Sequence, residues 1–488
     1  MIAFYLNSQP IRTPEPPASA LLDFVRYHEH LTGTKTGCRE GDCGACAVLV
    51  GELSADGQTV AYQSMTSCLT PLGNAQGKHI VTVEGINAAS GQLTPVQQAI
   101  VDEGGSQCGF CTVGFVMSLT GHSLSDKPAT GPNTLAAIDG NICRCTGYKS
   151  LERAAATLAA QLADRPTQNA LAWLGEQRFV PEYFAEMPAK LARLRAEAAA
   201  AEAPKNAPAA HGTAPAHPFA HALLGGGTDL LVQRLEELRE QPGVRLLFDQ
   251  PGRRGIRQPE PGGRVVLGAA TTASHLLESE LLRGLLPGLP QYLKLISSTP
   301  IRNMGTVAGN FINGSPIGDL TILFLALGAS VALLAADNTT REVALADLYL
   351  GYKKLAKATD EQVVEISFPA PRPGDFFHFE KVSKRTHLDI ASVNSAAWLR
   401  VENGVIQAAR VSAGGVGPVP LLLARTSAFL VGKELTEHTL QDANAVMQDE
   451  ISPISDVRGT VEYKRLLLRQ LLWAHFMQVA PSLSLARW

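Results

Sequence analysis

The chain has 488 residues, of which 45% are hydrophobic and 18% are charged. At roughly 150 residues per domain this length predicts about three domains, and the apolar content is enough to fill their cores, which excludes a disordered tail or a fibre. Lys and Arg total 42 against 45 Asp and Glu, a net charge of −3. Because this balance provides no broad positive field, neither nucleic acid nor anionic lipid is expected as a partner.

The N-terminal segment has no basic stretch followed by a long apolar one. Export through a signal peptide is therefore not expected, and the cytoplasm is the predicted location. Residues 320–336 carry no charge, but Gly328 interrupts them and they are shorter than the about 20 apolar residues that a membrane span needs. Their change from Leu- and Phe-rich to Val- and Ala-rich predicts a buried helix that runs into a buried strand.

All eight cysteines lie in the first 145 residues and divide into two sets of four. In a reducing compartment, clustered thiols indicate a metal centre before they indicate disulfides. The first set is Cys38, Cys43, Cys46 and Cys68. Its C-x4-C-x2-C spacing with a distant fourth cysteine is typical of plant-type [2Fe–2S] ferredoxins. The surrounding residues predict a small, mostly β domain with a hairpin over 47–62 and a helix near 21–29.

The second set is Cys108, Cys111, Cys143 and Cys145. It combines C-x2-C with C-x-C, and 31 residues separate the two pairs. Structural zinc remains an alternative at this set, although C-x-C is tighter than the usual spacing of zinc ligands. Residues 94–102, 112–121, 134–138 and 149–163 have helical periodicity, which predicts a small helical bundle with the cysteines among its helix ends.

In this order the two sets, with the stretches GSQCGFC and GNICRCTGY in the second, closely resemble the iron–sulfur domains of the molybdenum hydroxylases. The resemblance implies a [2Fe–2S] cluster at each set. The first would lie in a ferredoxin-like β-grasp domain, residues 1–86, and the second in a four-helix domain, residues 87–165. Apolar neighbours of the second set, Phe110, Val113 and Phe115, are expected to be available for packing or docking.

Beyond a linker at residues 166–177, the pattern predicts a strand at 179–181 and a helix at 189–199, followed by an insertion near 198–217 that is rich in Ala and Pro. Residues 220–238 then predict a strand, a glycine turn and a helix. Bare N–H groups and the positive end of a helix dipole suit that turn to a pyrophosphate, although three glycines also fit a plain loop. A second segment, residues 301–319, gathers small and amide-bearing residues around turns, as close approach to a cofactor requires.

Both segments resemble the flavin domain of the same family, whose fold is shared with vanillyl-alcohol oxidase. The resemblance implies an α+β multidomain chain with an FAD-binding domain at residues 178–370 and an α+β C-terminal domain at 371–488. It also implies a set of residues that bind the cofactor: Leu223, Leu224, Gly225, Gly226, Gly227, Thr228, Asp229, Leu230, Thr306, Gly309, Asn310, Asp319, Val363 and Lys381.

Three of these residues carry specific expectations. Asp319 is expected near the adenosine ribose or the phosphates, Val363 on the adenine side and Lys381 on the flavin side. The plain alternatives for the last two are a core valine and a surface lysine.

No residue suggests a base or nucleophile for attack on a purine, so no catalytic residue is assigned. The chain ends without a molybdenum-cofactor region, and the resemblance implies the small subunit of a two-subunit xanthine dehydrogenase that oxidises hypoxanthine and xanthine to urate. Electrons would pass from the molybdenum cofactor of a large partner subunit, in an (αβ)2 heterotetramer, through the second and then the first cluster to FAD and NAD+. The acceptor could also be O2.

Two other classes of function stay open. One is the equivalent subunit of an aldehyde or aromatic hydroxylase or of 4-hydroxybenzoyl-CoA reductase. The other is a zinc-stabilised interaction protein without redox activity.

The cysteine assignment predicts about four irons per chain in two spectroscopically distinct clusters. Cys43→Ala should remove one EPR signal and Cys145→Ala the other, because each substitution deletes one ligand of a different set. If either variant kept both signals, the ligand assignment would be wrong.

Overall fold

The computed structural model describes residues 1–87, 90–202, 222–241 and 243–481. The chain divides into two compact units, of which the first is formed by Met1–Phe248 with Ser298–Met304 and the second by Asp249–Ser297 with Gly305–Trp488. The described part of the chain contains no helix that is both long and apolar enough to cross a membrane.

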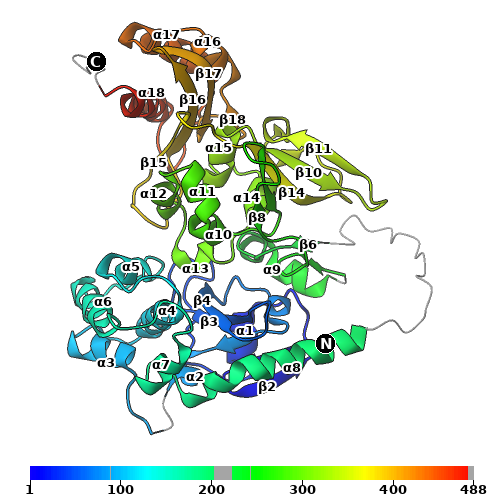
Figure 1. Cartoon of the computed structure of the whole chain (residues 1–488), viewed down its shortest axis with the longest axis vertical. Coiled ribbons are helices and arrows are strands. Elements are labelled where there is room, and N and C mark those ends of the chain that lie inside the picture. The colour runs from blue at the N-terminus through cyan, green and yellow to red at the C-terminus, as the bar shows by residue number, and fades with distance from the viewer. Residues whose placement is uncertain (88–89, 203–221, 242, 482–488) are drawn as a thin grey trace. The chain divides into compact units, whose positions relative to one another are not determined.

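A five-stranded mixed sheet forms the N-terminal part of the first unit (Figure 1, blue). Its strands are β1 (Ile2–Leu6), β2 (Gln9–Thr13), β3 (Ala47–Leu53), β4 (Val60–Thr66) and β5 (His79–Val81), in the order β2-β1-β5-β3-β4. The pair β1/β5 is parallel and the other pairs are antiparallel. The expected β-grasp arrangement and the β3–β4 hairpin are therefore confirmed. The expected helix is α1 (Leu21–Asp23), which continues into the π-helical turn η1 (Phe24–His28).

Strand β3 is apolar on both sides because both faces of the sheet are covered. Ala47 and Leu49 pack into a core with the helices of this unit. Val48 and Val50 point to the opposite face, where they share a core with residues of α1 and η1. This two-sided burial fixes the sheet between two layers and holds the cysteine loop that precedes β3.

Four helices follow the sheet, as the periodicity predicts. They are α3 (Pro95–Asp102), α4 (Thr112–Leu124), α5 (Gly131–Ala136) and α6 (Lys149–Gln161), after the short α2 (Val83–Ile86). Thr94 and Gln97 form a capping box that begins α3. Helix α4 is buried continuously from Gly114 to Ser123, as expected for a central helix that is apolar all round.

The predicted strand at residues 179–181 is wrong. Residues 179–181 lie in the bend that connects α7 (Leu171–Glu176) to the 3-10 turn η3 (Glu182–Glu186), and η3 leads directly into α8 (Met187–Glu202). Phe179 and Phe184 are buried in the core of the helical layer, which explains their apolar character without a strand. Helix α8 continues through residues 198–202, where an insertion was expected, and residues 203–217 of that insertion lie outside the described residues.

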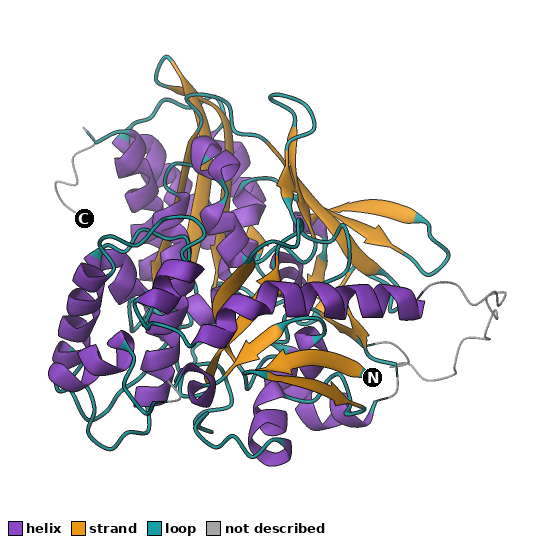
Figure 2. Ribbon diagram, turned by 60° about the horizontal axis from the view of Figure 1, so that its bottom comes forward, coloured by secondary structure: helices purple, strands orange, loops and turns teal. Residues whose placement is uncertain are grey.

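Helix α8 lies against the first sheet, as Figure 2 shows for the long helix that ends at the grey trace. Met187, Leu191 and Leu194 share a small core with Ala3 and Tyr5 of β1. The predicted strand–turn–helix is also confirmed in this unit: β6 (Leu223–Leu224) pairs in parallel with β7 (Arg245–Leu246), and α9 (Leu230–Glu240) follows the glycine turn. The predicted domain boundaries stay a prediction.

The second unit begins with an antiparallel sheet in the order β11-β10-β14-β9-β8. Its strands are β8 (Ile256–Arg257), β9 (Arg264–Gly268), β10 (Ser330–Leu334), β11 (Thr340–Ala344) and β14 (Gln362–Pro369). Its helices are α10 (Ala273–Glu278), α11 (Glu280–Leu285), α12 (Leu289–Lys294), α14 (Val307–Asn313) and α15 (Asp319–Ala326). Every residue from Leu320 to Ala326 is buried, and β10 follows, so the predicted helix that runs into a strand is confirmed.

The C-terminal part of the second unit is a four-stranded antiparallel sheet covered by three helices. The strands are β15 (Phe376–Val382), β16 (Val393–Glu402), β17 (Val405–Gly414) and β18 (Leu421–Leu422), and the helices are α16 (Ala424–Leu430), α17 (Glu437–Glu450) and α18 (Val461–Val479). Leu468, Leu472 and Phe476 of α18 pack against Val393 and Ala397 of β16. This arrangement is the predicted α+β closing domain.

The packing of α8 gives a stability prediction. Leu191→Ala should lower the free energy of unfolding of the first unit by roughly 2 to 5 kcal/mol, because Leu191 is fully buried and its loss leaves a cavity. Arg193→Ala on the exposed side of the same helix is the control and should change it by less than about 0.5 kcal/mol. Denaturant unfolding of both variants checks the prediction, and equal midpoints would contradict it.

Candidate cofactor sites

The sulfur atoms of the first set lie together in the loop before β3 and at the end of β4. The Cys46 and Cys68 Sγ atoms are 3.3 Å apart, and both residues are buried. Cys38 Sγ accepts hydrogen bonds from the backbone N–H groups of Glu40 at 3.3 Å and Cys43 at 3.4 Å. Donors aimed at a sulfur stabilise its thiolate, the form that binds a metal.

The protonation of this set is uneven. The hydrogen bond with the Cys43 thiol, together with the backbone donors, lowers the pKa of Cys38 to about 5 against the opposing effect of burial. The Cys46 thiol and burial raise the pKa of Cys68. These shifts favour the thiolate at Cys38 and the protonated thiol at Cys68, and metal ligation would require the thiolate at both.

The second set joins the start of α4 to the loop before α6. The Cys108 and Cys145 Sγ atoms are 3.6 Å apart, and both residues are exposed. Cys143 is buried beside Cys111, where burial, followed by the hydrogen bond to Cys143, raises the pKa of Cys111 to about 12. The Tyr148 hydroxyl accepts the backbone N–H of Cys143 at 3.1 Å, which fixes the loop.

The donor sets fit two-iron clusters. In each set the thiols come as two contacting pairs: Cys38 with Cys43 and Cys46 with Cys68, then Cys108 with Cys145 and Cys111 with Cys143. A [2Fe–2S] cluster takes two thiolates on each iron, whereas one tetrahedral zinc ion needs four donors around a single point. The paired arrangement therefore favours iron–sulfur clusters, and the assignment of the eight cysteines as ligands stays a prediction.

The two cysteine loops touch each other directly. The backbone N–H of Ile142 donates to the carbonyl oxygen of Cys43 at 3.0 Å. Beside it, Asn141 Nδ2 donates to the carbonyl oxygen of Gly44 at 3.3 Å. Gly44 has a φ of +68°, and a methyl group on it would lie 2.3 Å from the carbonyl oxygen of Gly140, so only glycine permits this approach. Since Ile142 precedes Cys143, one hydrogen bond links the backbones of the two sets.

The glycine turn of residues 225–229 packs tightly within the first unit. A methyl group on Gly226 would lie 1.8 Å from the carbonyl oxygen of Met304, and Gly227 has a φ of +86°. Asn74 Nδ2 donates to the carbonyl oxygen of Gly225 at 3.0 Å, which anchors the turn at its start. The need for glycine at position 226 therefore already follows from the protein's own backbone. The role of residues 223–230 in holding a pyrophosphate stays a prediction.

The second predicted flavin segment belongs to the first unit up to Met304 and to the second unit from Gly305 onward. Thr306 caps α14, and its Oγ1 accepts the backbone N–H of Gly309 at 3.0 Å. Asn310 Oδ1 accepts hydrogen bonds from the backbone and the hydroxyl of Thr321, at 3.1 and 3.0 Å. These bonds tie the first turn of α14 and its middle to the start of α15, and they keep Thr306, Gly309 and Asn310 close together.

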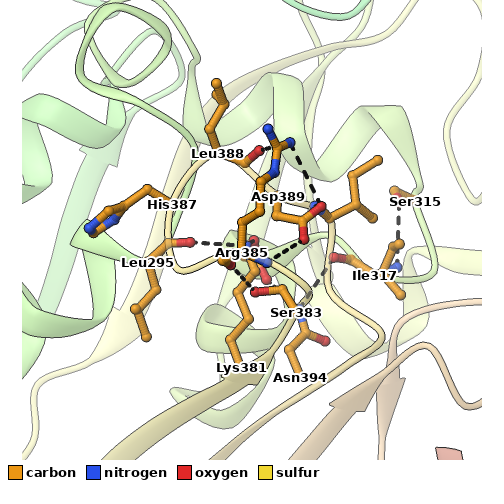
Figure 3. Close-up of polar contacts among 12 residues, drawn as sticks. Leu295, Ser315, Ile317, Lys381, Ser383, Arg385, His387, Leu388, Asp389 and Asn394 are labelled. Carbon is orange, nitrogen blue, oxygen red and sulfur yellow. Dashed lines mark hydrogen bonds and ion pairs between the residues drawn. The ribbon is translucent and has the colours of Figure 1, made fainter. Parts of the chain in front are cut away.

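Lys381 and Asp319 form a buried ion pair, and Figure 3 shows Lys381 among its neighbours. Lys381 Nζ lies 2.7 Å from Asp319 Oδ2 and donates to the carbonyl oxygen of Leu295 at 2.9 Å. Asn394 Nδ2 donates to Asp319 Oδ1 at 2.6 Å. Only 1% of the Lys381 side chain is exposed, so the surface-lysine alternative is wrong.

This contact bears on the predicted roles in FAD binding. Since Asp319 and Lys381 touch, they do not lie at two separate ends of a site, and the role of either residue in binding FAD stays a prediction. Val363 is a core residue of β14, 6% exposed. Among the residues that we did not predict, Ile142, Asn141 and Asn394 make the contacts described above. The only signal in the sequence for the first two is their place directly before Cys143.

The glycine turn gives the prediction for the flavin. Gly226→Ala should keep both iron–sulfur signals and lose bound flavin, because the added methyl group displaces the turn from the Met304 carbonyl. Gly175→Ala is the matched control, since Gly175 lies in the first unit, has no positive φ, as Gly226 has none, and has open space around it. Iron and flavin content of the purified variants check the prediction. Full flavin occupancy in Gly226→Ala would move the flavin site elsewhere.

Four family models match the chain in succession. Residues 4–73 match the 2Fe-2S iron-sulfur cluster binding domain, and residues 82–156 match the [2Fe-2S] binding domain. Residues 201–371 match the FAD binding domain in molybdopterin dehydrogenase, and residues 378–479 match the CO dehydrogenase flavoprotein C-terminal domain. The two iron–sulfur domains and the FAD-binding domain predicted from the sequence are thereby confirmed.

Known proteins are similar along the whole chain. Xanthine dehydrogenase 1 of Arabidopsis thaliana is 27% identical over 98% of this chain and 40% of its own length. Aldehyde oxidase 4 of Cavia porcellus is 26% identical over 99% of this chain and 39% of its own length. The chain thus spans about two fifths of the length of these relatives.

Among solved structures, reconstituted CO dehydrogenase from Oligotropha carboxidovorans is 30% identical, with a TM-score of 0.50, over 53% of this chain and 88% of that one. The similarity and the four domains agree with each other and with the paired cysteines. The chain belongs to the molybdenum hydroxylase family, of which it carries the iron–sulfur and flavin domains.

Proposed function

We propose that this chain is the electron-transfer subunit of a xanthine dehydrogenase, in which it passes electrons from a molybdenum site on a partner subunit to FAD and then to NAD+. The observation that carries the proposal is the direct contact between the two cysteine loops through the Ile142 N–H and the Cys43 carbonyl. Carriers held in adjoining loops of one rigid unit are suited to exchange electrons. The bound clusters and flavin supply the redox chemistry, and the protein holds them in place.

The chain's own residues account for how the clusters and the flavin would be held in place. Paired thiols would bind each cluster, and in the first set backbone N–H groups favour the charged form of the Cys38 sulfur. The Lys381–Asp319 pair provides one buried cation beside the predicted flavin segment. Catalytic side chains for attack on a substrate are not part of the proposal, so substrate oxidation belongs to another site.

The surface around the second set supports a protein partner. Cys108 and Cys145 are exposed, and so are the apolar side chains of Phe110, Ile142 and Tyr148, at 46%, 39% and 39%. Grouped exposed apolar side chains are typical of a surface that a partner covers. Phe115 is fully buried, so of its two expected roles it serves packing in the core and not docking.

Xanthine as substrate rests on the relatives that are named xanthine dehydrogenase and align over nearly the whole chain. The similarity to an aldehyde oxidase is almost as strong, so the second candidate is the equivalent subunit of an aldehyde hydroxylase. NAD+ as acceptor, an (αβ)2 heterotetramer and a cytoplasmic location complete the proposal.

The proposal predicts a division of activity between the subunits. The isolated chain, loaded with its cofactors, should reduce an artificial dye with NADH, because its flavin accepts electrons without the partner. It should show no xanthine-dependent reduction of NAD+ until the molybdenum-bearing subunit is added. An aldehyde assayed in parallel with xanthine separates the two candidates.

Two results would contradict this account. Xanthine turnover by the pure chain, with no molybdenum detected by elemental analysis, would remove the need for a partner. Turnover of the aldehyde but not of xanthine by the reconstituted complex would replace the proposed substrate by the second candidate.

A further inference from the structure

Residues Ser298–Met304, which include α13 (Thr299–Arg302), belong to the first unit although the chain on both sides of them belongs to the second. Within the first unit this short segment contacts three places: the approach to the second cysteine set, the first cysteine set and the glycine turn.

The first contact is a buried ion pair. Arg302 Nη2 donates to Asp139 Oδ2 at 2.5 Å, and only 4% and 8% of the two side chains are exposed. The backbone N–H of Thr299 donates to Asp139 Oδ1 at 2.7 Å, and the Thr299 hydroxyl donates to the carbonyl oxygen of Ala136 at 3.2 Å. Asp139 lies four residues before Cys143, so these bonds hold the backbone that leads into the second set.

The second contact is with the first set. A methyl group on Gly41, between Cys38 and Cys43, would lie 2.6 Å from Ile301 Cδ1, so the Ile301 side chain fills the space beside this loop. Ile301 also packs against the core that contains Cys46 and Cys68. The segment therefore touches the loops of both cysteine sets.

The third contact is with the glycine turn. The carbonyl oxygen of Met304 occupies the space where a side chain on Gly226 would lie. Met304 is itself held, because its sulfur accepts a hydrogen bond from the Thr66 hydroxyl at 3.5 Å. Asn303 Nδ2 donates to the carbonyl oxygen of Ser64 at 2.9 Å, which anchors the same end of the segment on β4.

The ion pair is the most directional of these contacts. A buried charge is unfavourable unless it is paired and hydrogen-bonded, so Arg302 and Asp139 are held to one geometry. The Arg302 Nη2 atom also donates to Thr299 Oγ1 at 2.8 Å, a second bond that the single ammonium of a lysine would not place in the same way. A purely apolar contact would tolerate sliding of the segment, whereas these bonds do not.

We propose that Ser298–Met304 is a spacer that fixes the distances between the two cysteine sets and the glycine turn, and that Arg302 is its positioning residue, acting through Asp139. The inference rests on the proposed function only in that electron carriers occupy these places. Because electron transfer slows steeply with distance, a spacer that fixes these distances would also influence the rate of electron transfer between the carriers.

The test compares Arg302→Lys and Thr299→Val with Arg153→Lys in the full-length, cofactor-loaded chain. Arg153 pairs with Glu103 on the surface of the same helical layer, so its variant is a matched control. Both clusters are reduced with dithionite and their magnetic interaction is measured by low-temperature EPR. The dipolar splitting falls with the cube of the distance between the spins, so it reports spacing and not folding alone.

Arg302→Lys should keep its full iron content yet lose the resolved splitting or narrow it, and should bind less flavin than the parent chain. Thr299→Val should change the splitting and the flavin content in the same direction by a smaller amount, and Arg153→Lys should change neither quantity. If both segment variants retain iron and show the splitting of the parent chain, the spacer is refuted. If Arg302→Lys loses its iron, Thr299→Val decides by the same criterion, because it removes only a hydroxyl group.

This outcome is separate from that of the proposed function, since neither xanthine nor a partner enters the measurement. Altered splitting in the variants, without xanthine turnover by the complex, would contradict only the proposed substrate. Xanthine turnover with unaltered splitting would overturn only the spacer.

Discussion

One hydrogen bond, from the Ile142 N–H to the Cys43 carbonyl, joins the loops that carry the two cysteine sets. Alone this hydrogen bond contributes only about 0.5 to 1.5 kcal/mol to the free energy of unfolding, which is too little to hold the two loops together. The surrounding contacts do so: Gly44 leaves room for the Gly140 carbonyl, and Asn141 bonds the Gly44 carbonyl. The constraint that matters is therefore steric, because a side chain at position 44 would collide with the Gly140 carbonyl oxygen and keep the two loops apart.

The rest of the first unit keeps that contact in place. The sheet is buried on both faces, one under α1 and η1 and the other under the helical layer, so the strands next to the first set cannot shift independently of the helices next to the second. The segment Ser298–Met304 adds a third support with its buried Arg302–Asp139 pair. A family that passes electrons between fixed carriers is expected to need this rigidity, because the protein contributes spacing and environment while the cofactors contribute the chemistry.

Much of this organisation could be predicted from local signals. Cysteine spacing, alternating apolar residues and the glycine turn each depend on neighbours in the chain, and the hairpin β3–β4, the α15–β10 pair and the strand–turn–helix before α9 were found in this way. The errors came from tertiary packing. Residues 179–181 suggested an opening strand, but Phe179 fills the core of the helical layer, and Phe115 is buried inside the same core. Lys381 is buried because Asp319, 62 residues earlier, neutralises it, and no local pattern reveals such a pair. That Ser298–Met304 belongs to the first unit could not be predicted for the same reason, because it depends on contacts with residues far away in the sequence.

The central claim is that one chain holds two iron–sulfur clusters and one flavin as connected carriers. An anaerobic titration of the purified chain with dithionite, followed by its visible spectrum, tests this most directly. The account predicts an uptake of about four electrons per chain, one for each cluster and two for the flavin, with bleaching of both chromophores. An uptake of about two electrons or fewer by chains with full iron and flavin content, or a colourless protein, would contradict it.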